Sequence, residues 1–239
     1  MTKLEILKYI LHTPENTNTA ILEQMLDQYK STPVITDAAT ITEIASNPSI
    51  HSFELTEPIE STSETQFNHK VFVDGAANPV TTSSTGKIWT FLSGADCENI
   101  VLESTAANET WSSSYGVQFY TGKSTITNGT FSGHNAGILV NGGTLTLKGT
   151  IDVSNNYFGG IEVSKGAAGG LEPSVLDVSD CTLINKSEKY GKPTIWIDGI
   201  DAETGRVIGG NLTEVLFTKE DGTQQLHYYL HSANAKPAK

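Results

Sequence analysis

Four segments of the chain share one pattern: "YGVQFYTG" from Tyr115, "NAGILVNG" from Asn135, "FGGIEVSK" from Phe158 and "KPTIWIDG" from Lys192. When they are aligned, apolar residues occupy two columns that lie two positions apart. The first column contains Val117, Ile138, Ile161 and Ile195, and the second contains Phe119, Val140, Val163 and Ile197. Alternation with a period of two places both columns on one face of a strand. The pattern therefore predicts four similar strands that bury the same face.

The spacing of the segments predicts how these strands are stacked. Gly116, Gly137 and Gly160 recur about every 22 residues, and the glycine-rich stretch "KGAAGGLEP" (165–173) lengthens the next step. A turn of this length has room for three short strands and three bends. Three further segments hold equivalent places, namely "STITNGTF" (124–131), "TLTLKGTI" (144–151) and "SVLDVSDCTL" (174–183). Self-similarity at a fixed period indicates stacked coils, so we expect a mainly β protein built as a right-handed parallel β-helix. A β-sandwich, the alternative, would show hairpins with two-residue turns and no fixed register.

Asparagine and cysteine residues fit the same prediction. Asparagines precede the repeated strand at Asn135, at Asn155 and Asn156, and at Asn185. An amide turned inward at a bend can bond the backbone of a neighbouring coil. Cys97 and Cys181 share the contexts "DCENIVL" and "DCTLIN" several coils apart, beyond the reach of a disulfide. We expect two free, buried thiols.

The composition narrows the classes of partner. The chain has 239 residues, 15 of them basic and 27 acidic, and a formal net charge of −12. This charge argues against nucleic acid and anionic membranes as partners. No segment has the roughly 18 apolar residues of a membrane span, and the first residues lack the apolar region of a secretory signal. We expect a protein made in a cytoplasm. The two cysteines and the acidic run at 198–205 lack the spacing of metal ligands, so no metal or cofactor is predicted.

The N-terminal segment has a different periodicity. Residues 4–11 and 20–29 each place apolar side chains on one helical face, and "HTPENTNT" (12–19) separates them, which predicts a short helical hairpin. Two helices this short cannot enclose a core alone. They either cover the open first coil or anchor the chain to another protein, and we favour the anchor because a mixed polar segment separates them from the first clear coil. The apolar docking residues would be Leu7, Ile10, Leu11, Ile21, Leu22, Met25 and Leu26.

These patterns divide the chain into four regions. Residues 1–30 form the hairpin anchor, and residues 31–84 form a linker with the first strands, which cap the solenoid. The β-helix spans residues 85–225. Residues 226–239 begin with a strand that can cover the edge of the last coil and end in a tail that we expect to be mobile.

Three of the quoted stretches carry a resemblance to a known fold family. "DCENIVLES", "STITNGTFSGHNAGILV" and "SNNYFGGIEVS" resemble coils of the pectate-lyase-like β-helix superfamily, over roughly residues 85–215. Its members include polysaccharide lyases, glycoside hydrolases and phage spikes, so the resemblance implies carbohydrate as the ligand class. The chain departs from the superfamily's catalytic motifs, because "SGHNAG" (132–137) lacks the second half of "GHG" and Arg206 stands in "TGRVIGG" rather than in "RIK".

The hairpin carries a second resemblance. "YILHTPENTNTAILEQMLDQY" is similar to the opening of virion-associated proteins of tailed phages, among them head-fibre proteins, over about residues 5–29. There, a helix, a connector and a second helix precede an unrelated displayed domain. The resemblance implies a virion protein that docks on a capsid or other virion protein through its hairpin. By analogy with phage fibres we expect a homo-oligomer, with a trimer as the leading state.

Two functions therefore remain open. The first is a non-enzymatic display protein of a phage particle, a head fibre or capsid decoration, that binds host-surface or environmental glycans. Candidate glycan-binding residues are the aromatic ones at or beside the repeated strand: Tyr115, Tyr120, Tyr157, Tyr190 and Trp196. An internal aromatic stack is the alternative for the tyrosines that precede the strand.

The second function is a carbohydrate-active enzyme. Glu162 and Asp198 lie on the face opposite the apolar columns, one coil and two residues apart, which corresponds to roughly 8 Å at the backbone. The carboxylates of inverting glycosidases are about 6.5–9.5 Å apart, so this pair could act as acid and base. A chance pair on a carboxylate-rich solenoid is the competing explanation, and we favour it, with no catalytic residue assigned.

Overall fold

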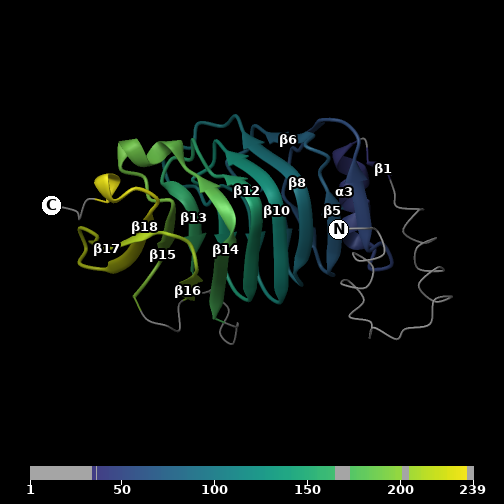
Figure 1. The fold of residues 1–239 in the computed structure, drawn as a ribbon. Coiled ribbons are helices and arrows are strands. Elements are labelled where there is room, and N and C mark those ends of the chain that lie inside the picture. Colours follow the sequence, from purple (N-terminus) through teal and green to yellow (C-terminus); the bar gives the residue numbers. More distant parts are fainter. Residues whose placement is uncertain (1–33, 36, 165–172, 201–204, 236–239) are drawn as a thin grey trace, which may run out of the picture.

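The computed structural model describes residues 34, 35, 37–164, 173–200 and 205–235. The protein is mainly β, and its strands stack side by side along the molecule (Figure 1). The predicted hairpin, with Leu7, Ile10, Leu11, Ile21, Leu22, Met25 and Leu26, lies outside the described residues. None of the helices among the described residues is long and apolar enough to cross a bilayer.

The described strands form two sheets. One sheet contains, in order, β1 (Val34–Ile35), β2 (Ser52–Leu55), β5 (Val71–Asp74), β8 (Ala95–Ser104), β10 (Lys123–Ser132), β12 (Thr144–Asp152), β14 (Ser174–Ile184) and β16 (Gly205–Ile208), with β6 (Pro79–Thr82) beside β8 and β3 (Ile59–Glu60) beside β6. The other sheet contains, in order, β4 (Thr65–Phe67), β7 (Trp89–Phe91), β9 (Tyr115–Phe119), β11 (Ala136–Val140), β13 (Gly159–Val163), β15 (Ile195–Ile197), β18 (Gln224–Tyr229) and β17 (Thr213–Thr218). From β7 to β16 the chain alternates between the sheets, and each strand pairs in parallel with the second strand after it.

The strand register confirms the two apolar columns. Ile138 of β11 lies opposite Val117 on one side and Ile161 on the other, and Ile161 lies opposite Ile195. The second column aligns in the same way, from Phe119 to Ile197. Every side chain of both columns is buried in the main core.

Parallel pairing also extends through residues 34–84, the predicted linker and first strands. There β2 pairs with β5, β5 with β8, and β4 with β7. Aromatic rings follow the interior of these coils, with centroids 5.7 Å apart between Phe53 and Phe67, 4.8 Å between Phe67 and Phe91, and 5.5 Å between Phe91 and Phe119. Such offset stacking is favourable, and it makes one continuous core out of successive strands.

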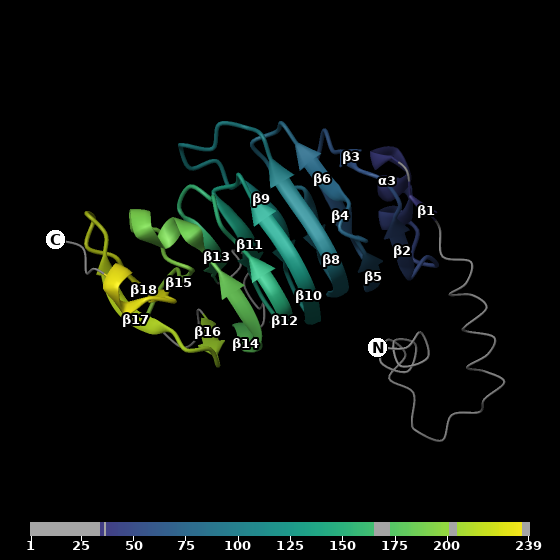
Figure 2. The same cartoon turned by 45° about the horizontal axis from the view of Figure 1, so that its top comes forward.

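A helix closes the N-terminal end of this core. The helix α3 (Ala38–Ser46) begins after Asp37, whose side chain accepts a hydrogen bond from the Thr40 amide, as a capping aspartate does. Its residues Ile41 and Ile44 are buried in the main core. The helix lies at the end of the stacked strands, as Figure 2 shows from a second side.

The long strands of the first sheet bend in the middle, which accounts for the third bend predicted for each coil. Asn99, Asn128 and Gly149 have positive φ angles of 52°, 57° and 66°, and the register between β10 and β12 shifts beside Asn128. The two cysteines lie on different sides of the bend in their respective strands. Cys97 lies before it, opposite Ile126, whereas Cys181 lies after its own bend, opposite Gly149. Both thiols are free, but only Cys97 is buried; the prediction of burial is wrong for Cys181, which is half-buried because it lies on the other side of the bend.

At the other bend, Asn135 and Asn156 bond the backbone of the preceding coil rather than that of the coil that follows. Asn135 accepts hydrogen bonds from the amides of Ser112 and Ser114, at 2.7 and 3.1 Å. Asn156 accepts from the His134 amide at 3.0 Å and donates to the Phe131 carbonyl at 2.9 Å. Asn185 instead bonds within its own coil, where it caps the 3-10 helix η1 (Lys186–Tyr190).

The C-terminal end differs from the predicted extent of the β-helix. Parallel pairing ends at β16, and β17 and β18 form an antiparallel hairpin that packs on the edge of β15. The hairpin turn contains Asp221 and Gly222, and Gly222 has a φ of 83° that favours glycine. A short 3-10 helix, η2 (Ser232–Asn234), follows β18.

Candidate ligand-binding site

A cavity of about 590 Å³ lies at the C-terminal end of the second sheet, on the face opposite the main core. Glu162 of β13 and Trp196 of β15 line it, together with Asp198 just after β15. The hairpin supplies a second wall, consisting of Phe217, Lys219, Gln225, His227 and Tyr229. The remaining wall comes from Trp111, Phe158 and the segment 191–193.

Three of the residues singled out from the sequence meet in this cavity. The register places Glu162 directly opposite Trp196, and Asp198 follows two residues further along the neighbouring strand. A fourth, Tyr115, contacts Glu162 from two strands away. Tyr120 and Tyr157 are half-buried and Tyr190 is exposed, and these three do not line the cavity.

Glu162 is a buried carboxyl group. Its side chain is 6 % exposed, and its Oε2 accepts a 2.7 Å hydrogen bond from the Tyr115 hydroxyl. Burial raises the pKa of Glu162 to about 7, and the nearby charge of Asp198 adds to this effect, whereas the Tyr115 hydroxyl and Lys219 oppose it. At neutral pH the group is therefore present in both its protonated and its ionised form.

Asp198 has a different environment. Its side chain is 46 % exposed, and its Oδ1 accepts hydrogen bonds from Lys219 Nζ at 3.1 Å and from Gln225 Nε2 at 2.6 Å. Both donors come from the hairpin, more than twenty residues along the chain. The two carboxyl groups of the cavity thus differ in burial and in partners, which is the arrangement that separates the roles of paired carboxylates in enzymes.

The hairpin wall is mostly aromatic and uncharged. The His227 ring stacks on Phe217 with centroids 4.4 Å apart and an angle of 8° between the planes. Burial, and to a lesser extent the charge of Lys219, lowers the pKa of His227 to about 4, so the ring is neutral at pH 7. Its Nε2 lies 3.1 Å from Gln225 Oε1.

Aromatic rings also form the opposite rim. Trp111 is 50 % exposed and meets the ring of Phe158 edge-on, with centroids 5.2 Å apart. The ammonium group of Lys192 lies 5.7 Å from the Phe158 ring centroid. Trp196 faces away from the main core, as its register predicts, but it is only 5 % exposed, because it packs with Tyr115, Ala136 and Leu139 in a separate cluster. Its ring covers Gly159, where a Cβ would lie 2.7 Å from the ring and would clash.

Several cavity residues were not among the sequence candidates. Phe217, Lys219, Gln225 and His227 enter the site because the hairpin folds back onto β15. The Asp-Gly pair at 221–222 lies between two segments in which apolar and polar residues alternate. This pattern is typical of a β-hairpin and could have predicted the hairpin wall. Trp111 stands in a polar segment before the repeated strand, and no pattern marks it.

The cavity has the chemistry of a site for an uncharged polar ligand. Its two carboxyl groups, Glu162 and Asp198, are accompanied by two ammonium groups, Lys192 and Lys219. Within the described part of the chain, no three His, Cys, Asp or Glu side chains are grouped so that they could hold a metal ion. Comparison of the chain with protein-family models, curated proteins and solved structures finds no match.

Proposed function

We propose that the chain is a non-enzymatic display protein of a tailed phage particle, a right-handed parallel β-helix whose C-terminal cavity binds a neutral sugar residue of a glycan. The observation that carries the proposal is the cavity itself, in which aromatic rings surround closely spaced hydrogen-bonding groups. Sugars present both apolar ring faces and hydroxyl groups, and such a site satisfies both.

The strand order supports the β-helix. Successive strands alternate between two sheets, and each pairs in parallel with the strand one coil later. Parallel crossover connections within a sheet are almost always right-handed, which supports that hand for the coil.

The balance of charge supports a neutral ligand. An acidic sugar would face the carboxyl groups of Glu162 and Asp198, and a cationic ligand would face the ammonium groups of Lys192 and Lys219. A neutral sugar can instead accept from the ammonium groups and from the Gln225 amide while it donates to the carboxylates. The half-exposed Trp111 provides a flat surface at the rim for stacking.

Two arguments support attachment to a particle through residues 1–30. The first is the similarity of residues 5–29 to the openings of virion-associated proteins. The second is that α3 already closes the N-terminal end of the described core, through Ile41 and Ile44. An apolar hairpin is then not needed as a cap, and it remains available to bind a capsid or other virion protein, with the protein assembled as a homo-oligomer, a trimer by analogy with fibres.

The binding proposal is tested by titrating the full chain with three neutral trisaccharides, maltotriose, cellotriose and chitotriose, and with trigalacturonate as an acidic counterpart. We expect at least one neutral trisaccharide to bind more tightly than trigalacturonate and to change tryptophan fluorescence. Trp111→Ala should weaken binding at least tenfold, whereas Tyr190→Ala, which removes an exposed ring outside the cavity, should not. Absence of binding to all three neutral sugars, or equal effects of the two substitutions, would contradict the proposal.

The virion assignment is tested with particles made from a gene that lacks codons 1–30. We expect these particles to lack the protein, while the truncated chain keeps its β signal in circular dichroism. An unfolded fragment would identify the hairpin as a cap, and a decorated particle would place the anchor elsewhere.

A second candidate function is a glycoside hydrolase, favoured by one observation: Glu162, with a pKa of about 7, shares the cavity with Asp198. In this scheme Glu162 donates a proton to the leaving oxygen, and Asp198 activates the attacking water. The test is release of reducing ends from bacterial surface glycans. Turnover that disappears in Glu162→Gln would favour the enzyme, and binding without turnover favours the display protein.

A further inference from the structure

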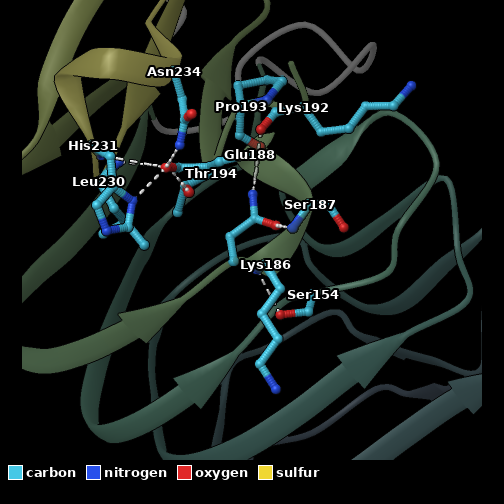
Figure 3. Close-up of polar contacts among 11 residues, drawn as sticks. Ser154, Lys186, Ser187, Glu188, Lys192, Pro193, Thr194, Leu230, His231 and Asn234 are labelled. Carbon is cyan, nitrogen blue, oxygen red and sulfur yellow. Dashed lines mark hydrogen bonds and ion pairs between the residues drawn. The ribbon is translucent and has the colours of Figure 1, made fainter. Parts of the chain in front are cut away.

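Glu188 is a buried carboxylate that does not line the cavity but connects two of the cavity walls. Glu188 lies in η1, is 2 % exposed, and occupies the centre of a group of polar contacts in Figure 3. The turn that carries it is fixed at its start, because the Asn185 side chain accepts from the Ser187 amide at 3.0 Å and donates to the Pro193 carbonyl at 3.2 Å. Gly191, Lys192 and Pro193, which line the cavity, follow directly.

The partners of Glu188 come mainly from the segment after β18. Its Oε1 accepts from the Thr194 hydroxyl and from the Leu230 amide. Its Oε2 accepts from the His231 amide at 3.2 Å, from His231 Nδ1 at 2.9 Å and from Asn234 Nδ2 at 3.3 Å. Burial alone would raise the pKa of Glu188, but these hydrogen bonds outweigh burial and lower it. The carboxylate is therefore ionised at neutral pH, and it holds donors from segments more than forty residues away along the chain.

This contact lies between two walls of the cavity. On one side, η1 leads into the segment 191–193. On the other, β18 carries Gln225, His227 and Tyr229 into the cavity and ends one residue before Leu230. β18 pairs with three residues of β15, Ile195, Trp196 and Ile197, and the Thr194 amide donates to the Tyr228 carbonyl at 2.9 Å. The contacts of Glu188 continue this attachment past the end of the strand.

We propose that Glu188 is a positioning residue for the sugar-binding cavity, because it fastens the end of β18 to η1 and so holds the hairpin wall against the segment 191–193. The identity of the ligand in this inference rests on the proposed sugar-binding function, whereas the connection that Glu188 makes between the two walls does not. Glu188 does not touch the cavity; it acts through the elements that do. Loss of the carboxylate would remove the acceptor of the half-buried Leu230 amide, of the His231 amide and of the buried Thr194 hydroxyl, which favours separation of the segment after β18.

The test uses the full chain with Glu188→Ala, and with Asn234→Ala as a milder variant that removes one donor. Glu220→Gln, an exposed carboxylate in the hairpin turn, is the matched control for the loss of one charge. Hydrogen exchange at Leu230 and His231, and acrylamide quenching of Trp196 fluorescence in a Trp111→Phe background, report on the walls without any ligand. We expect exchange at these amides to rise at least tenfold in Glu188→Ala and by a smaller factor in Asn234→Ala. Quenching should increase in both variants. In Glu220→Gln, exchange and quenching should both stay unchanged. Exchange in β8 and β10 should stay unchanged throughout.

The ligand readout is the affinity for the neutral trisaccharide, maltotriose, cellotriose or chitotriose, that the wild type binds. We expect Glu188→Ala to weaken it at least tenfold and Glu220→Gln to leave it within twofold. Faster exchange with unchanged affinity would overturn the positioning role, and so would unchanged exchange. If Glu188→Ala does not fold, the intermediate effect of Asn234→Ala on exchange and affinity decides the question. If the wild type binds none of the sugars, the proposed function fails, whereas the exchange and quenching measurements still decide whether Glu188 holds the walls together.

Discussion

Replacing Glu162 by glutamine should change how the stability of the protein depends on pH. The ordinary pKa of a glutamate is 4.5, and burial raises that of Glu162 to about 7 in the folded chain. The folded state therefore binds this proton more tightly than the unfolded state does. Its contribution to stability is complete below pH 4.5 and is lost as the pH rises through 7. The interval between the two pKa values corresponds to about 3 kcal/mol in the free energy of unfolding, at roughly 1.4 kcal/mol per pH unit.

Glutamine keeps the shape of the side chain and can accept the Tyr115 hydrogen bond, but it does not ionise. The free energy of unfolding of Glu162→Gln minus that of the wild type should therefore rise by about 3 kcal/mol between pH 4 and pH 8.5. Urea denaturation at several pH values measures this difference. Taking the difference between two proteins cancels the titration of all other groups. Glu220→Gln is the control, because it replaces an exposed carboxylate that does not line the cavity.

A pH-independent difference for Glu162→Gln would refute the reasoning. It would mean that the carboxylate of Glu162 titrates in the folded chain as it does in the unfolded chain, and the cavity would then lack its buried acid. The hydrolase alternative would then lose its main support. A difference of the opposite sign would mean that Glu162 is ionised and paired in the folded state, as Glu188 is.

Three further predictions concern the coils. Gly133→Ala should lower the melting temperature much more than Gly191→Ala, because both glycines have φ near 80° but only at Gly133 would a Cβ collide with the backbone of the preceding coil. Asn156→Ala should destabilise the protein by about 3 kcal/mol in urea denaturation, because a buried amide and a buried carbonyl lose their partners. In a thiol-reagent assay at pH 8, Cys97 should react only on unfolding and Cys181 slowly in the folded state. Cys97 is buried and Cys181 half-buried, and burial raises the pKa of Cys181 to about 11 and that of Cys97 well above its ordinary value.

The parallel pairing of the strands could be predicted from the sequence because the information that specifies it is local and repeated. Alternation of apolar residues identified the buried face of β11 and β13, and the repeat identified which residues lie opposite each other, such as Ile138 and Ile161. The inward asparagines followed from their fixed place before each strand. Cys181 was misplaced because the shared motif does not hold the same place in both strands: Cys97 lies opposite Ile126, before the bend, and Cys181 lies opposite Gly149, after it.

The candidate site could be predicted only in part. Glu162, Asp198 and Trp196 belong to the repeat, so their proximity followed from the register. Their partners do not belong to it. Lys219 and Gln225 reach Asp198 because an antiparallel hairpin replaces the next parallel coil, and Glu188 finds its donors beyond the end of that hairpin. The repeat contains no information about where it stops.

Because the strands of the apolar columns pair in a constant register, the length of the stack of strands is proportional to the number of repeats. Each coil separates its neighbours by about 4.8 Å, and the strands from β1 to β8 contribute no residue to the cavity. Inserting or removing a coil among them would therefore move the cavity toward or away from the N-terminus in fixed steps and leave its walls intact. Duplication of one segment of about 22 residues would thus lengthen the stack of strands, and the residues that line the cavity could change independently of that length.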